Sequence, residues 1–384
     1  MFTRNCIRSG AAAALGLSAV LGGCVLECAP RGMSPRDPAV EALRPLRLPG
    51  DWEHADTLLL SCDELVEHHQ RVFTDVAAAA RGEAVLVGLV ADEQRRRAAV
   101  ELLAAAKLPP DSVRFVTVRT NTAWVRDYGP LPVRGRDGAT LLIDLEYPSI
   151  LKTSSRSSDD LAPMDLGRVL GLPVVSAALR ADGGALLSNG EGLCVASTAI
   201  LADNAVRGRD RTEVQRILTD VTGCRRLVFV EPLAGERTRH VDMFICFLAA
   251  DQAVVARCDP ARDAVNARIL DAAAEKLAGV RTSRGPMKVD RVPMPPKLNG
   301  QWRTYTNVLL AGGKLLAPTY SNVKPSLQRE VLDVYRRLLP GRTVVGVNAD
   351  TLAARNGSLH CIALNVPRSA IRRITGRAGK MNAE

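Results

Sequence analysis

Apolar and polar residues along the chain follow a pattern that occurs four times. Each copy predicts two strands joined by a turn, then an amphipathic helix, then a third strand. The copies begin at residues 131, 185, 241 and 305, which lie 54, 56 and 64 residues apart. This spacing predicts an internal repeat whose units bury their apolar faces against one another.

The predicted elements have the same order in each copy. They are strands 131–133 and 139–146, helix 160–170 and strand 173–177; strands 185–188 and 192–197, helix 211–221 and strand 226–230; strands 241–248 and 253–258, helix 261–278 and strand 289–293; strands 305–310 and 314–317, helix 325–338 and strand 343–347. Asn189-Gly190 is a strong hairpin signal in the second copy. An ordinary α/β sheet with irregular insertions is the alternative.

The two ends of the chain predict a fifth unit. Strand 359–366 would join strand 57–61, helix 64–80 and strand 84–89. Helix 92–106 and strand 113–118 are left over, and the pattern gives them no place.

Composition narrows the class of protein. The apolar fraction of 47% is typical of a globular protein with a core. Six of the ten net positive charges belong to the N-terminal segment and to the basic tail 368–384. Aromatic residues make up only 4% and do not interleave with a basic stripe, so nucleic acid is not an expected partner.

The N-terminus predicts export. Arg4 and Arg8 precede a short apolar run at 11–21, typical of a signal peptide covering 1–23. Leu21-Gly-Gly-Cys24 resembles the bacterial lipobox, which implies lipidation of Cys24 and membrane anchoring on the periplasmic or cell-surface side. Residues 24–49 are rich in proline and predict a stiff tether.

The chain has nine cysteines without Cys-x-x-Cys spacing, so neither a zinc site nor any other metal site is expected. Seven would remain after the signal segment and the lipobox cysteine are set aside, and at least one of these cannot pair internally. Disulfides are compatible with export, but the sequence does not choose their partners.

Three short motifs carry candidate chemistry: Trp124-Val-Arg-Asp127, His240-Val-Asp242 and His360-Cys361. Two carboxylates can hold a planar guanidinium, a thiolate can add to its carbon, and an imidazole can move protons. In a strand, His240 and Asp242 would share one face, whereas His360 would point away from Cys361. Each motif alone also has a structural interpretation, such as an Asp127–Arg126 ion pair or a buried Cys361.

Five blocks in order resemble the agmatine deiminase and Porphyromonas-type peptidylarginine deiminase family. Besides the three motifs, they are Asp182-Gly-Gly with Asn189-Gly190-Glu191-Gly192, and Arg303-Thr-Tyr305-Thr-Asn307. The resemblance implies a pentein fold over residues 50–367, a five-fold pseudosymmetric α/β propeller of hairpin-helix-strand repeats.

The resemblance also implies roles. Cys361 is the expected nucleophile, His240 the general acid and base, and Asp127 and Asp242 the guanidinium ligands. Trp124, Arg126, Asp182 and Asn307 are expected to bind substrate, and no metal or organic cofactor is required.

A deiminase that releases ammonia through a Cys thiouronium intermediate is the main hypothesis. Agmatine is the default substrate, and free or peptidyl arginine is the other. An amidinotransferase, a dimethylarginine hydrolase and a non-catalytic pentein are the alternatives, and oligomeric state is not predicted.

Overall fold

The computed structural model of this protein describes residues 32–148 and 156–371. The predicted signal peptide, Cys24, residues 24–31 of the tether and residues 372–384 of the tail lie outside the described residues. Within the described part, no helix is long and apolar enough to cross a membrane.

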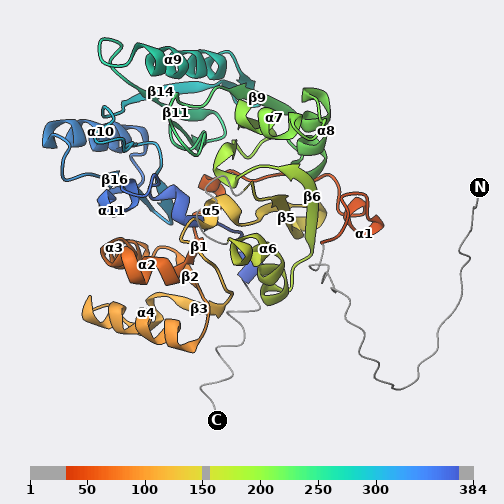
Figure 1. The fold of residues 1–384 in the computed structure, drawn as a ribbon, viewed down its shortest axis with the longest axis horizontal. Coiled ribbons are helices and arrows are strands. Elements are labelled where there is room, and N and C mark those ends of the chain that lie inside the picture. Colours follow the sequence, from red (N-terminus) through yellow and green to blue (C-terminus); the bar gives the residue numbers. More distant parts are fainter. Residues whose placement is uncertain (1–31, 149–155, 372–384) are drawn as a thin grey trace, which may run out of the picture. The chain divides into compact units, whose positions relative to one another are not determined.

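The four predicted repeats are present as four separate three-stranded sheets (Figure 1). In each sheet an antiparallel pair of strands is followed by a third strand that runs parallel to the second. The strands are β4 (Leu131–Arg134), β5 (Thr140–Glu146) and β6 (Val174–Arg180); β7 (Leu186–Ser188), β8 (Leu193–Ser197) and β9 (Arg226–Val230); β10 (Ile245–Ala249), β11 (Gln252–Arg257) and β14 (Lys288–Pro293); and β15 (Leu309–Ala311), β16 (Lys314–Thr319) and β17 (Thr343–Asn348).

The two ends of the chain form the fifth unit, as predicted. Strand β18 (Ala363–Asn365) pairs antiparallel with β1 (Thr57–Ser61), and β2 (Val85–Val90) runs parallel to β1. The strand that the sequence left without a place is β3 (Arg114–Thr117), which extends this sheet parallel to β2. Because β18 comes from the C-terminus, this sheet joins the first and last segments of the fold.

At least one helix lies between the two parallel strands of each unit, because a parallel crossover requires a long connection. These helices are α6 (Ser157–Leu170), α8 (Arg211–Thr222), α9 (Ala264–Ala278), α10 (Pro325–Leu338), and, between β1 and β2, α2 (Cys62–His68) with α3 (Gln70–Ala80). Helix α4 (Glu93–Ala105) connects β2 to β3, α7 (Thr198–Ala205) follows β8, and two short helices are α1 (Pro38–Glu41) and α11 (Asp350–Ala353). Asp210 caps the first turn of α8 by accepting a hydrogen bond from the Glu213 N–H.

Several predicted boundaries are wrong, and most of them fall at the chemical motifs. Strand β10 begins at Ile245 rather than 241, β15 begins at Leu309 rather than 305, and β18 begins at Ala363 rather than 359. The predicted helix 64–80 is interrupted at His69, whose φ of −132° and ψ of 38° are not helical. The segments that carry His240, Asn307 and Cys361 are therefore turns that lead into strands.

The predicted tether and tail also need correction at their inner ends. Val40, Leu46 and Leu48 are buried in an apolar cluster with β4 to β9 residues, and the Met33 N–H donates to the Val174 carbonyl at 2.7 Å. Residues 32–49 therefore pack on the fold instead of forming a free spacer. At the other end, Ala370 and Ile371 are also buried, so the packed chain continues beyond residue 367.

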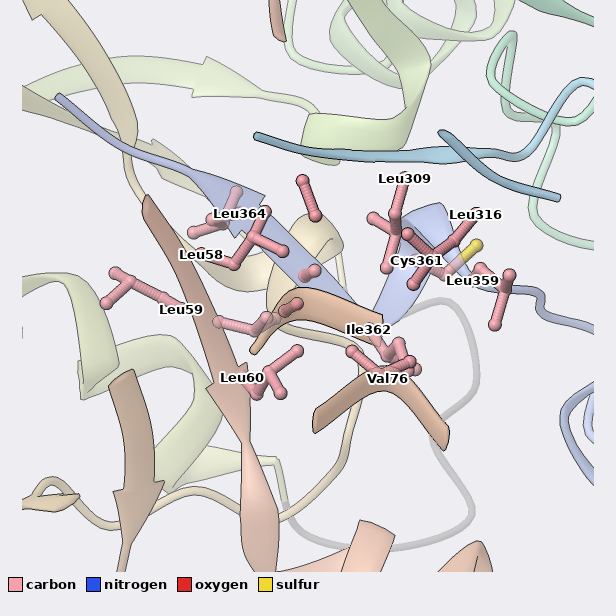
Figure 2. Packing of buried hydrophobic residues seen from close by; sticks show 14 of the residues in the cluster. Leu58, Leu59, Leu60, Val76, Leu309, Leu316, Leu359, Cys361, Ile362 and Leu364 are labelled. Carbon is pink, nitrogen blue, oxygen red and sulfur yellow. The ribbon is translucent and has the colours of Figure 1, made fainter. Parts of the chain in front are cut away.

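Apolar core residues pack against one side of the proposed nucleophile. Cys361 belongs to an apolar cluster with Leu309, Leu359 and Ile362, drawn in Figure 2. A disulfide joins Cys194 to Cys224 in a separate cluster, and both residues are almost fully buried.

Candidate active site

Asp127 lies on a short helical turn, α5 (Val125–Tyr128), that directly follows Trp124. Gly129 ends this turn by donating its N–H to the Val125 carbonyl at 2.9 Å. A side chain at Gly129 would place its Cβ 2.3 Å from that same carbonyl oxygen. Glycine is therefore required at position 129 by close backbone packing directly after the turn that carries Asp127.

A tight loop presents His240 and Asp242. The buried carboxylate of Glu236 accepts hydrogen bonds from the N–H groups of Thr238 and Arg239, and Arg239 has a φ of +61°. The N–H groups of Val241 and Asp242 both donate to the Gly184 carbonyl, at 3.1 and 3.2 Å.

Gly184 lies directly against the imidazole. A Cβ at this position would be 2.5 Å from Nδ1 of His240 and 3.1 Å from Oδ1 of Asp127. The glycine therefore lets the Asp182-Gly-Gly segment approach both side chains closely, which links three of the sequence motifs.

Asn307 holds the turn that carries the nucleophile. Residues His360–Ile362 form a single 3₁₀ turn, and Oδ1 of Asn307 accepts the His360 N–H at 2.7 Å. Nδ2 of Asn307 donates to the Asp242 carbonyl at 3.2 Å and lies 3.5 Å from Sγ of Cys361. The Asn307 side chain is fully buried, so its partners are protein groups.

One pocket collects residues from five distant segments. Its lining residues are Trp124, Asp127, Tyr147, Arg156, Asp182, Arg237, Thr238, His240, Arg355, Asn356, Gly357 and Cys361. Asp242 contacts the nucleophile from beside the pocket, with Oδ2 4.0 Å from Sγ of Cys361. The four residues expected to be catalytic are therefore brought together.

His240 lies between two carboxylates. Its Nδ1 is 3.5 Å from Oδ1 of Asp127, and its Nε2 is 3.1 Å from Oδ2 of Asp182. Burial opposes a charge on the ring, but Asp127 and Asp182 outweigh it and raise the pKa of His240 to about 10. Burial, together with the nearby Asp182 and Asp242, raises the pKa of Asp127 to about 7.

The carboxylates have unused acceptor capacity. Oδ1 of Asp127, Asp182 and Asp242 is in each case buried without a hydrogen-bond partner among the described residues. A buried acceptor without a partner costs free energy, so three in one place indicate a site shaped for a ligand rich in donors.

Cys361 is held as a thiol in the ligand-free site. Burial raises the pKa of the Cys361 thiol well above its usual value, and the negative charges of Asp242 and Asp127 raise it further. A cation bound between these acids would reverse the second effect, because a positive charge favours the thiolate.

His360 lies outside the pocket that Cys361 lines, as expected, although the two residues are in a turn rather than in a strand. Nδ1 of His360 is 2.8 Å from Oδ2 of Asp242, and Nε2 is 3.0 Å from Oδ2 of Asp51. His360 and Asp51 are the residues that sequence reasoning missed. Asp51 gave no signal because it lies some three hundred residues from its partner and in no motif.

The four expected substrate-binding residues separate into two groups. Trp124 lines the pocket, and Asp182 lines it while contacting His240. Arg126 does not line it: its guanidinium donates to the Ala363 carbonyl and to Oδ1 of Asp51, each at 3.1 Å. Asn307 does not line it either, and both residues bond to protein groups of the nucleophile segment. Their contact with substrate stays a prediction.

The described residues contain no group of three or more His, Cys, Asp and Glu side chains arranged to hold a metal ion. The acids and imidazole of the pocket are instead paired with one another or directed at the space beside Cys361.

The site therefore brings together a buried thiol, an imidazole between two carboxylates and a third acid. The profile of the Porphyromonas-type peptidyl-arginine deiminase family matches residues 47–367, and the chain belongs to this family. It is therefore a hydrolase that acts on the guanidino C–N bond.

Similar proteins agree with this assignment. A Yersinia pestis protein named as a candidate agmatine deiminase is 25% identical over 328 residues, covering 78% of this chain and 87% of the relative. The solved structure of agmatine deiminase from Enterococcus faecalis has a TM-score of 0.74 at 18% identity and covers 88% of this chain and 98% of that one. A candidate arginine deiminase from Porphyromonas gingivalis has a TM-score of 0.72 at 24% identity and covers 84% and 99%. The solved structures share the mixed α/β fold.

Proposed function

We propose that this enzyme deiminates the guanidinium of an arginine-type substrate through a covalent intermediate on Cys361. The observation that carries the proposal is a set of three buried carboxylate oxygens without a hydrogen bond among the described residues, on Asp127 and Asp182 of the pocket and on Asp242 beside the thiol. A guanidinium offers five N–H donors in a plane and a positive charge, so it matches these carboxylate acceptors better than an ammonium does.

In the first half of the reaction, Asp127 and Asp242 bind the guanidinium and its charge draws the Cys361 thiol toward the thiolate. Sγ then forms a bond to the guanidinium carbon, and the C–N bond to one amino group breaks. His240, protonated at neutral pH, supplies a proton to the departing nitrogen, and the thiol proton restores His240. Ammonia leaves, and a thiouronium remains on sulfur.

In the second half, ammonia has taken the proton of His240 and left as ammonium, so the neutral imidazole removes a proton from water, whose oxygen bonds to the same carbon. The C–S bond breaks, the sulfur regains a proton, and the ureido product leaves. The released proton accompanies ammonia as ammonium, so atoms and charge balance.

Arginine residues that line the pocket favour arginine-type substrates over agmatine. Arg237 lines the pocket, is exposed and has no ion-pair partner among the described residues, while Arg355 beside it pairs with Glu64. An exposed arginine repels the ammonium at the far end of agmatine and attracts a carboxylate. Asp182, the acid expected to meet that second charge, has one of its two oxygens bonded to His240.

We therefore favour arginine, free or in a peptide with a carboxylate near the side chain, over agmatine. The relatives named above as agmatine deiminases support agmatine as the second candidate. They give no support to an amidinotransferase or a non-catalytic role.

Two further expectations belong to the proposal. The buried Cys194–Cys224 disulfide supports export, since such bonds persist in oxidising compartments, and we retain lipid anchoring through Cys24 as a hypothesis. The fifth sheet, built from both chain ends, supports a closed ring of five units, the propeller implied by the family resemblance.

The test is ammonia release from agmatine, arginine and arginine peptides. We expect release from at least one arginine substrate, with kcat/KM about tenfold above that for agmatine, and none from Cys361→Ser. Agmatine as the best substrate would contradict this interpretation of the pocket arginines. Release from no guanidine substrate, or wild-type release by Cys361→Ser, would contradict the function.

A further inference from the structure

A second cavity adjoins the nucleophile segment through His360. It is lined by Asp51, Leu187, Ser188, Ile245, Cys246, Phe247, Thr306, Val308, Leu310 and His360. His360 lines this cavity, whereas Cys361, the next residue, lines the substrate pocket. The adjacent residues of one turn thus face two different spaces.

His360 connects these spaces through hydrogen bonds. From Sγ of Cys361 the distances are 4.0 Å to Oδ2 of Asp242 and then 2.8 Å from that oxygen to Nδ1 of His360. Nε2 of His360 lies 3.0 Å from Oδ2 of Asp51, whose side chain is 28% exposed. The chain of polar groups that begins at Cys361 therefore ends at Asp51, whose side chain contacts water.

The geometry favours one protonation state of the ring. Both ring nitrogens face carboxylate oxygens, and a neutral imidazole has only one N–H to donate. With both carboxylates ionised, only the imidazolium donates to Asp242 and Asp51 together. Arg126 completes the network by donating to the other oxygen of Asp51.

All charged and titratable groups around the ring are consistent with this state. Burial and Arg126 lower the pKa of His360, but the hydrogen bonds to Asp242 and Asp51 outweigh them and raise it. Of the two thiols nearby, Cys361 remains protonated as described above, and burial raises the pKa of Cys246 to about 12.

We propose that His360 is a doubly protonated positioning residue that is anchored by Asp51, holds Asp242 in place for the guanidinium, and exchanges its proton through the second cavity. Oδ2 of Asp242 is then fixed by the imidazolium, which leaves the unpartnered Oδ1 for the substrate. The role of Asp242 rests on the proposed function, whereas the state of His360 does not.

Asp51→Asn is the discriminating variant. Its amide can donate to a neutral Nε2 of His360 while Nδ1 still donates to Asp242, so the contacts survive and only the charge is lost. Asp51→Glu keeps the charge and serves as the conservative rescue. Asp144→Asn is a matched control, since Asp144 is a largely buried acid that bonds Ser176 and lies outside both cavities.

The first measurement is a pH titration of the full chain with ¹⁵N-labelled imidazole rings. The chain has five histidines, so the His360 signal is assigned by its loss in His360→Gln. We expect two protonated ring nitrogens on His360 at pH 7 in the wild type. In Asp51→Asn the midpoint falls by about one pH unit or more, and Asp144→Asn leaves it unchanged.

The second measurement is the pH profile of kcat/KM. Asp51→Asn should lose activity at a lower pH on the alkaline side and recover it toward acid pH, and Asp51→Glu should restore the wild-type profile. A uniform loss at every pH would mean a purely structural role and overturn the proposal. A singly protonated His360 at pH 7 in the wild type would overturn it without any variant or any substrate.

Discussion

The two buried histidines of the site have the same kind of surroundings, but they line different cavities. His240 lies between Asp127 and Asp182, and His360 lies between Asp242 and Asp51. Both rings line a cavity, but only the cavity of His240 also contains the Cys361 thiol.

The difference is in the carboxylates. Asp127 and Asp182 each keep one buried oxygen without a hydrogen bond among the described residues, and the one on Asp127 faces Nδ1 of His240 only at 3.5 Å. Both oxygens of Asp51 are bonded, one to Arg126 and one to His360. An incomplete set of hydrogen bonds marks the region that receives a ligand, and a complete set marks the region that holds it in shape.

The largest effect should follow substitution of the ring that faces the thiol. His240→Gln removes the general acid and base, so we expect kcat to fall by about 10²–10⁴-fold. The measurement is steady-state ammonia release with the best arginine substrate. A loss of less than tenfold would assign proton transfer to another group.

Asp127→Asn should follow, with kcat/KM lower by about 10²-fold, because the amide cannot offer a charged acceptor to the guanidinium. Asp127 also helps to raise the pKa of His240. Removing its charge lowers that pKa, so the alkaline limb of the kcat profile should move to lower pH. An unchanged alkaline limb would show that the charge of Asp127 does not affect the pKa of His240.

His360→Gln should have a smaller effect, about tenfold in kcat/KM, carried more by KM than by kcat. The glutamine can donate to only one of the two carboxylates, and Asp242 then holds the guanidinium less well. A loss as large as that of His240→Gln would remove the distinction between the two regions.

The smallest expected effect is on stability. The folded-state pKa of His240 is about 10, above its ordinary value of 6.5. Its charge therefore stabilises the fold fully below about pH 6.5, and this contribution is lost as pH rises through 10. Between pH 7 and 10, the wild-type Tm should fall a few degrees more than that of His240→Gln. Parallel decreases in the two proteins would contradict the raised pKa.

The sequence predicted the repeats well because each unit has local signals. Asn189-Gly190 forms the predicted hairpin between β7 and β8, with φ of +82° at Gly190, and α10 (Pro325–Leu338) has the predicted bounds. The convergence of Asp127, His240, Asp242 and Cys361 followed from the family's motifs.

What failed was geometry inside the motifs. His240 and Asp242 do not share a strand face, because backbone bonds to Gly184 hold them in a turn. Arg126 and Asn307 carry motif positions but bond protein groups, and Asp51 depends on a contact between distant segments. Such partners arise from tertiary packing, which local periodicity does not encode.

The most direct test of the central claim is mass spectrometry of enzyme quenched during turnover with an arginine substrate. Addition of Sγ with loss of ammonia predicts a peptide containing Cys361 that is heavier by the mass of the substrate minus ammonia. His240→Gln should accumulate this species if the slowed step is the attack of water, and Cys361→Ser should never form it. Ammonia release with no adduct on Cys361 under any quench, or with an adduct on another cysteine, would contradict the account.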